Sequence, residues 1–204
     1  MKLLKVIVLA TVFLAVSCKA SKYTDLDNGL YADIETNKGA ILVKLYQGDT
    51  PLTVANFVSL AEGTNPNVSD SLKGRKFYDG LKFHRVLKNF MIQGGGMTED
   101  MQQKPTKATI ENEAKNGLKN NKYSVAMART TAPHSASSQF FINVADNQLL
   151  DFPGQDGWGY CVFGEVVAGQ DVVGKIQSVE TLNLGSHADV PASPIIITKA
   201  FLQD

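Results

Sequence analysis

Alternating apolar and polar positions mark the chain soon after its N-terminal segment. Residues 31–36 and 40–46 each place apolar side chains at about every second position, which is the pattern of a half-buried β-strand. Asn37, Lys38 and Gly39 separate the two runs, and glycine tolerates the positive φ that tight turns need. The pattern therefore predicts an antiparallel hairpin.

Two segments carry helical periodicity instead. Thr50 followed by Pro51 is typical of a helix start, with threonine as the N-cap and proline in the first turn, and Gly63 is typical of a helix end. Between them, apolar residues recur at helical spacing, at Val54, Phe57, Val58 and Ala61. Residues 170–177 repeat the pattern over a shorter length. Two helices are therefore expected.

Further short apolar runs predict the remaining strands. They cover residues 123–129, 139–144, 159–167 and 194–201. A polar stretch at 97–122 predicts a long ordered loop. No internal repeat or linker divides the chain, so one domain is expected. Many short strands with two helices suit a closed antiparallel barrel, because closure removes exposed sheet edges.

The first residues are not typical of a folded domain. Lys2 and Lys5 precede an apolar run from Val6 to Val16, which is too short to span a bilayer and has the form of a signal peptide. The run ends in small residues before Cys18 and resembles a bacterial lipobox. This division predicts a signal peptide at residues 1–17, an acylated Cys18 with a tether to residue 28, and a domain at 29–204. The alternative is a plain secretory signal with an incidental cysteine.

Lipidation at Cys18 implies an anchor in the cell envelope. Lys19 follows the cysteine, rather than the aspartate that favours inner-membrane retention, so an outer-membrane anchor facing the periplasm is expected. Cys161 is then the single remaining cysteine, which excludes an internal disulfide in the mature domain. Its apolar neighbours predict a small buried side chain.

Charge excludes one class of partner. The chain has 20 basic and 20 acidic residues, and loss of the signal lysines makes the mature chain slightly acidic. A nucleic-acid-binding protein needs a basic face, so nucleic acid is not an expected partner. The three histidines lack the spacing of a metal site. No metal or cofactor is expected, and the domain is expected to be a monomer.

The stretch from Phe83 to Gly96 carries the most chemical information. It begins as a strand, turns at residues 88–89, and continues as an apolar run that ends in three glycines. The alternation places Phe83, Arg85 and Leu87 on one face and His84, Val86 and Lys88 on the other. Arg85, Phe90, Met91 and Gln93 then converge on one surface. One cation, one amide and two large apolar groups suit a mostly apolar ligand with a peptide backbone.

This stretch resembles the characteristic motif of the cyclophilin-type peptidyl-prolyl cis-trans isomerases. Residues 138–143 and 159–166 match the family too, and residues 126–129, 132–135 and 157–160 resemble its bacterial branch. The likeness covers about residues 31–201. It implies a closed eight-stranded antiparallel β-barrel capped by two α-helices. It also implies an enzyme that interconverts cis and trans X-Pro bonds, here in exported proteins, without a cofactor.

The chemistry that the resemblance implies needs no proton transfer. Rotation about an X-Pro bond is slow because the amide nitrogen shares its lone pair with the carbonyl. A donor aimed at that nitrogen lowers the barrier, and Arg85 is the candidate because it is always charged and its planar fork is directional. The expected substrate-binding set is Phe90, Met91, Gln93, Ala128, Arg129, Gln139, Phe141, Leu149, Leu150 and Tyr160.

Within that set the expected roles differ. Phe90, Met91 and Phe141 enclose the proline ring, with Leu149 beside them. Gln93 and Gln139 orient Arg85 or hold the substrate carbonyl. Ala128 and Arg129 offer backbone groups to the peptide. Phe140 and Phe141 face opposite sides of a strand, and the resemblance assigns Phe141 to the pocket.

Two positions depart from the eukaryotic pattern of the family. Leu149 stands where those proteins usually carry tryptophan, and Tyr160 stands where they carry histidine. Leucine lacks the apolar area and the N–H donor of an indole, so cyclosporin is expected to bind weakly. The competing hypothesis from another functional class is a chaperone or scaffold that holds peptides in the same groove without turning them over.

Overall fold

The computed structural model describes residue 23 and residues 26–203. The expected signal peptide, Cys18 and most of the expected tether lie outside the described residues. Among the helices that are described, none has the length and apolar character needed to cross a bilayer.

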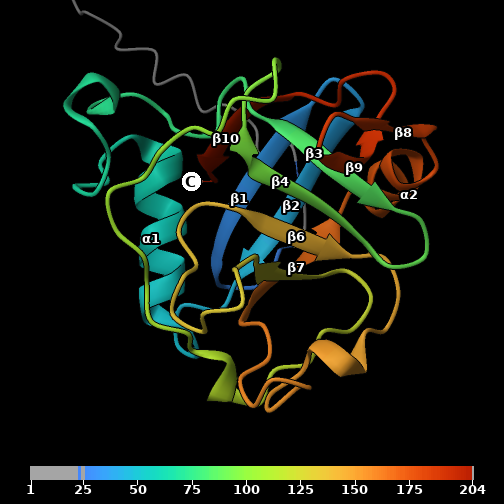
Figure 1. The fold of residues 1–204 in the computed structure, drawn as a ribbon. Coiled ribbons are helices and arrows are strands. Elements are labelled where there is room, and N and C mark those ends of the chain that lie inside the picture. The colour runs from blue at the N-terminus through green and yellow to red at the C-terminus, as the bar shows by residue number, and fades with distance from the viewer. Residues whose placement is uncertain (1–22, 24–25, 204) are drawn as a thin grey trace, which may run out of the picture.

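Eight strands form one antiparallel sheet that curls into a nearly closed barrel (Figure 1). Their order around the barrel is β10-β1-β2-β7-β5-β6-β4-β3. The strands are β1 (Leu30–Thr36), β2 (Gly39–Leu45), β3 (Lys82–Leu87), β4 (Met91–Met97), β5 (Ser124–Met127), β6 (Phe140–Asn143), β7 (Val162–Ala168) and β10 (Ile197–Leu202). The expected runs at 123–129, 139–144 and 159–167 thus contain β5, β6 and most of β7, with ends that differ by one to three residues.

The barrel has one seam, so the expectation of full closure is corrected. Strands β3 and β10 stand at the two ends of the sheet and meet through an isolated bridge between Lys82 and Ile196. Two backbone hydrogen bonds flank it, from Phe83 N to Ile195 O at 2.9 Å and from Ile197 N to Leu81 O at 2.7 Å. Pairing of the last strand with β1 begins at Ile197, three residues after the predicted start of this run.

The predicted hairpin and both predicted helices are confirmed. Strands β1 and β2 pair antiparallel through the turn that ends at Gly39. Helix α1 (Pro51–Glu62) ends at Gly63, whose φ is 78°, and helix α2 (Gln170–Gln177) has the predicted bounds. Figure 1 shows the two helices on opposite sides of the barrel.

The predicted capping by the Thr50 side chain is wrong. Its hydroxyl donates to Tyr46 O at 2.9 Å and makes no cap to the helix. The carboxylate of Glu113, from the long loop, accepts from Leu52 N at 3.2 Å and from Thr53 N at 2.8 Å instead. A negative group at this end is stabilised by the exposed N–H groups and the helix dipole. The long loop is thereby fixed to α1.

The strands separate two hydrophobic clusters. The larger fills the barrel and includes Phe83, Phe140 and Phe163. The smaller is built on Met91, Ala126, Phe141 and Val162, from four neighbouring strands. Phe140 and Phe141 belong to different clusters because adjacent strand residues point to opposite faces. The same strands therefore build the core and an apolar patch outside it.

A second hairpin was not predicted. Strands β8 (Thr181–Leu184) and β9 (His187–Pro191) pair antiparallel, and β9 lies against β3. Gly185 takes a φ of 58° in the two-residue turn between them. A Gly-Ser pair between two short alternating runs is a hairpin signal, so residues 181–191 carried a local indication of this hairpin.

Candidate active site

One row of residues crosses the sheet and defines the site. Arg85 on β3 pairs with Gln93 on β4, Gln93 pairs with Phe141 on β6, and Phe141 pairs with Ala126 on β5. Neighbouring strands lie about 4.8 Å apart, so the backbone positions of Arg85 and Phe141 are separated by about 10 Å. The cation, the amide and the apolar patch are therefore set side by side by strand register.

A β-bulge at His84 places Arg85 on the outer face. Phe83 pairs with Gly94 and Arg85 pairs with Gln93, so β3 has one more residue than β4 over this interval. The predicted face shared by Phe83 and Arg85 is therefore wrong. Phe83 lies in the barrel core, fully buried, while Arg85 lines the cavity outside it. The extra residue reverses the strict alternation from that point on.

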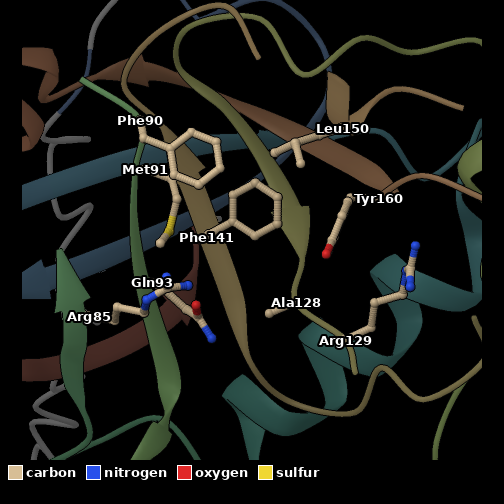
Figure 2. Close-up of a pocket in the computed structure, with 9 residues that line it drawn as sticks. All are labelled: Arg85, Phe90, Met91, Gln93, Ala128, Arg129, Phe141, Leu150 and Tyr160. Carbon is tan, nitrogen blue, oxygen red and sulfur yellow. The ribbon is translucent and has the colours of Figure 1, made fainter. Parts of the chain in front are cut away.

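The row opens into a cavity of about 210 Å³ on the outer patch (Figure 2). Met91 and Phe141, only 3% and 4% exposed, contribute apolar surface to its lining. Figure 2 shows Arg85 and Gln93 on one side, Tyr160 and Arg129 on the other, and Phe141 between them. The full lining is Arg85, Phe90, Met91, Gln93, Ala128, Arg129, Phe141, Leu150 and Tyr160.

Arg85 is held from the side away from the apolar patch. Its Nε lies 3.7 Å from Asp189 Oδ2 on β9, and its side chain remains 43% exposed. Asp189 has a φ of 60°, in the left-handed region. The adjacent His84 is buried, which lowers its pKa to about 4 and leaves it neutral near neutral pH. The cation next to the cavity therefore belongs to Arg85 and not to its neighbour.

Gln93 and Gln139 connect this cavity to a second one of about 160 Å³. Gln93 Nε2 donates to Gln139 Oε1 at 2.9 Å. Gly96 makes room for this contact, since a Cβ there would lie 2.3 Å from Gln139 Cγ. Gln139 lines the second cavity, and so do Gln93, Ala128 and Arg129, which line both. The second cavity is the more polar of the two.

The wall opposite Arg85 is an aromatic and cationic stack. Tyr160 meets Phe141 edge to face, with ring centroids 5.7 Å apart. On its other side the Arg129 guanidinium carbon lies 4.5 Å from the Tyr160 ring centroid. The wall thus rests on a cation that is itself nearly buried, with 2% of its side chain exposed.

Comparison with known proteins agrees with this geometry. The sequence profile of the cyclophilin type peptidyl-prolyl cis-trans isomerase family matches residues 31–201. The chain belongs to this family. Peptidyl-prolyl cis-trans isomerase B of Escherichia coli (strain K12) is 52% identical over 165 residues, which are 79% of this chain and 93% of that protein. Peptidyl-prolyl cis-trans isomerase cyp18 of Streptomyces antibioticus is 48% identical over 170 residues, 82% and 95% of the two chains.

A solved structure shares the cyclophilin fold. The crystal structure of a Cryptosporidium parvum cyclophilin type isomerase, obtained in the presence of the dipeptide Ala-Pro, aligns with a TM-score of 0.66. The alignment covers 85% of this chain and 99% of that chain at 21% identity. The likeness establishes the architecture of the barrel with its two helices.

This cyclophilin places most of the expected substrate-binding residues together. Leu149 is the exception, because it is 71% exposed and lines neither cavity, whereas the next residue, Leu150, lines the apolar one. The N–H of Ala128 donates to Gln139 O at 2.9 Å within the fold, so that donor is not available to a peptide. The side chain of Arg129 takes part in the wall, beyond the backbone role expected of it.

Two residues of this cyclophilin site were missed in the sequence. Asp189 comes from the unpredicted hairpin, and Asp156 pairs with Arg129 from a loop that holds no regular element. Neither carries a local signal of a site. Cys161 is buried as predicted, and burial raises the pKa of its thiol to about 11, so it stays protonated. Within residues 26–203 no group of three or more metal-ligating side chains occurs.

Proposed function

We propose that this cyclophilin accelerates X-Pro rotation through Arg85, and that its substrates are exported polypeptides. One observation supports the first part above all others. A planar charged donor stands on the rim of an apolar cavity, in the same cross-strand row as Gln93 and Phe141. The contact with Asp189 engages Nε, which leaves the two terminal nitrogens to face a peptide.

The energetics set the size of each contribution. The X-Pro barrier is about 18–20 kcal/mol, and a turnover of about 10³ s⁻¹ needs a barrier near 13 kcal/mol. The site must therefore remove about 6 kcal/mol. A charge-assisted hydrogen bond from Arg85 to the pyramidal proline nitrogen supplies about 1.5–3 kcal/mol. Transfer of the twisting amide, which is less polar than the planar one, onto Met91 and Phe141 supplies a further part.

Substitution of Arg85 separates this mechanism from simple peptide capture. In a proline-isomerisation assay on the fragment beginning near Ala20, Arg85→Ala is expected to lower kcat/KM by about 10- to 150-fold. Arg85→Lys keeps the charge but loses the planar guanidinium, so its kcat/KM is expected to lie between those of wild type and Arg85→Ala. Peptide affinity, measured by calorimetry, is expected to change less. Equal activity in wild type and Arg85→Ala would instead favour a scaffold that holds chains without turning them over.

The place of action rests on the N-terminal sequence. The signal-like segment and Cys18 support a lipid anchor that holds the domain at the envelope, where unfolded exported chains pass. Two or more acyl chains suffice for stable anchoring, because each buried CH₂ contributes about 0.8 kcal/mol. Expressed from the full chain, the wild type is expected in the membrane fraction with palmitate label, and Cys18→Ser in the aqueous fraction without it. An unlabelled wild type in the aqueous fraction would overturn the anchor.

A further inference from the structure

Arg129 is a nearly buried cation that the isomerisation mechanism does not use. Its side chain is 2% exposed, while the carboxylate of its acidic partner, Asp156, is 45% exposed. It follows the end of β5 and lines both the apolar cavity and the second, polar cavity. A buried cation is costly unless its donors are all engaged, so the partners of Arg129 identify what it holds.

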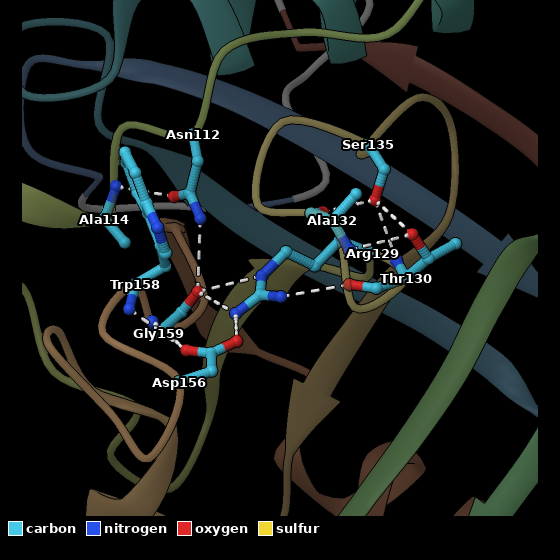
Figure 3. A network of polar contacts seen from close by, with 9 residues as sticks. All are labelled: Asn112, Ala114, Arg129, Thr130, Ala132, Ser135, Asp156, Trp158 and Gly159. Carbon is cyan, nitrogen blue, oxygen red and sulfur yellow. Dashed lines mark hydrogen bonds and ion pairs between the residues drawn. The ribbon is translucent and has the colours of Figure 1, made fainter.

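The partners belong almost entirely to the loop at residues 156–160 (Figure 3). Nε and Nη2 both donate to Gly159 O, at 3.0 and 2.9 Å, and Nη2 also pairs with Asp156. Nη1 donates to Thr130 O at 3.0 Å. The face of the same guanidinium stacks on Tyr160. One planar group therefore fixes a carbonyl, a carboxylate and an aromatic ring at the same time.

The loop is fixed from its own side as well. Asp156 Oδ1 accepts from Trp158 N at 3.0 Å and from Gly159 N at 3.1 Å, while its other oxygen pairs with Arg129. Asn112 Nδ2 donates to Gly159 O at 3.2 Å. Gly159 has a φ of 67°, and a Cβ there would lie 2.6 Å from Phe152 N. Tyr160 follows directly, so its ring direction depends on how this loop is held.

We propose that Arg129 is a positioning residue for substrate binding: with Asp156 it clamps the 156–160 loop so that Tyr160 closes the cavity opposite Arg85. The catalytic part of this inference rests on the proposed function, whereas the clamp itself does not. Lysine cannot replace the fork, because a single ammonium cannot bond Gly159 O twice and stack on Tyr160. Loss of the clamp weakens the grip on the proline side chain and leaves Arg85 in place.

Trp158 provides a readout that is independent of activity. It is the single tryptophan of the chain, lies within the clamped loop and meets His134 edge to face at 4.7 Å. Arg129→Lys and Arg129→Gln test the fork, and Asp156→Asn tests the carboxylate while keeping Arg129. Asp171→Asn is the matched control, because it removes the same kind of carboxylate from the exposed pair with Lys175 on α2.

The expected result is a change in Trp158 emission and a rise in KM of about tenfold in both Arg129 variants, with kcat within about threefold of wild type. Asp156→Asn is expected to change Trp158 emission and KM in the same direction but to a smaller extent. Asp171→Asn is expected to change neither. The clamp would be overturned if both Arg129 variants and Asp156→Asn had the same Trp158 emission and KM as the Asp171→Asn control. A fall in kcat at unchanged KM would overturn the positioning role. If the wild type lacked activity, the proposed function would fail while Trp158 emission still decided the clamp.

Discussion

Arg85 Nε faces Asp189 Oδ2 across 3.7 Å, from β3 to the β8–β9 hairpin. The two residues are 104 positions apart in the sequence, and neither side chain is buried, so the pair contributes little to stability. Its consequence is directional. A carboxylate beside Nε limits the rotamers of Arg85 and leaves the terminal nitrogens outside this ion pair.

Removal of that carboxylate tests the orientation. Asp189→Asn is expected to lower kcat/KM by at most about fivefold, because an exposed ion pair is worth about 0.2–1 kcal/mol. Asparagine is the suitable substitute, since it tolerates the left-handed backbone at this position better than alanine. The free energy of unfolding, from urea titration, is expected to stay within about 0.5 kcal/mol. Unchanged kinetics would mean that Arg85 needs no partner.

Gly96 is expected to be required for full activity because a larger residue would not fit beside Gln139. Its φ is not in the positive region, but an alanine Cβ would overlap the Gln139 side chain at 2.3 Å. Gly96→Ala should therefore break the bond between Gln93 and Gln139 and lower kcat/KM about two- to twelvefold. Gly174→Ala is the matched control, because nothing lies within 4 Å of its added Cβ on α2. That control should keep full activity and gain about 0.5–1 kcal/mol of stability.

The bulge residue His84 is expected to make stability depend on pH. Burial lowers its pKa from 6.5 to about 4, and Nδ1 has no hydrogen-bond partner among the described residues. Between those two values the unfolded chain binds the proton and the folded chain does not. Titration of His84 therefore leaves the free energy of unfolding unchanged above pH 6.5. It lowers that free energy as pH drops toward 4, by about 3 kcal/mol in total.

Urea titrations of wild type and His84→Gln across that window measure this contribution. The difference between the two unfolding free energies should change by about 3 kcal/mol from the upper to the lower end of the window. Parallel curves would show that the imidazole titrates alike in both states. The proposed mechanism transfers no proton, so activity per folded molecule should change less than stability does.

The Arg129–Asp156 pair should resist acid. The hydrogen bond from Arg129 lowers the pKa of Asp156 from 3.8 to about 2. A lowered carboxyl pKa stabilises the fold above 3.8, and that contribution is lost as pH falls through 2. Trp158 emission should accordingly show a transition near pH 2, where Asp156 of the folded chain takes up its proton. Asp156→Asn should abolish that acid transition, and an unchanged transition in this variant would assign it to another group.

Local sequence patterns predicted much of the fold. The β1–β2 hairpin followed from alternation and a glycine turn, and the bounds of α2 followed from helical spacing, because both depend on neighbours within a few residues. Leu149 shows where this reasoning ends. Its position suggested a pocket residue, yet the 3₁₀ turn at Gln148–Leu150 turns it outward and Leu150 inward. A turn of that kind reverses side-chain direction without a clear local signal.

By itself, the sequence determined most of the strands, both helices and most of the chemical groups at the site, since spacing and turn residues act locally. Tertiary structure alone decided how those groups face one another. The bulge at His84 moved Arg85 out of the core, an unpredicted hairpin supplied Asp189, and a loop brought Asp156 to Arg129. Asp189 and Asp156 come from segments 104 and 27 residues away from their partners, and the bulge depends on the register of β3 against β4. No local pattern encodes strand register or loop packing.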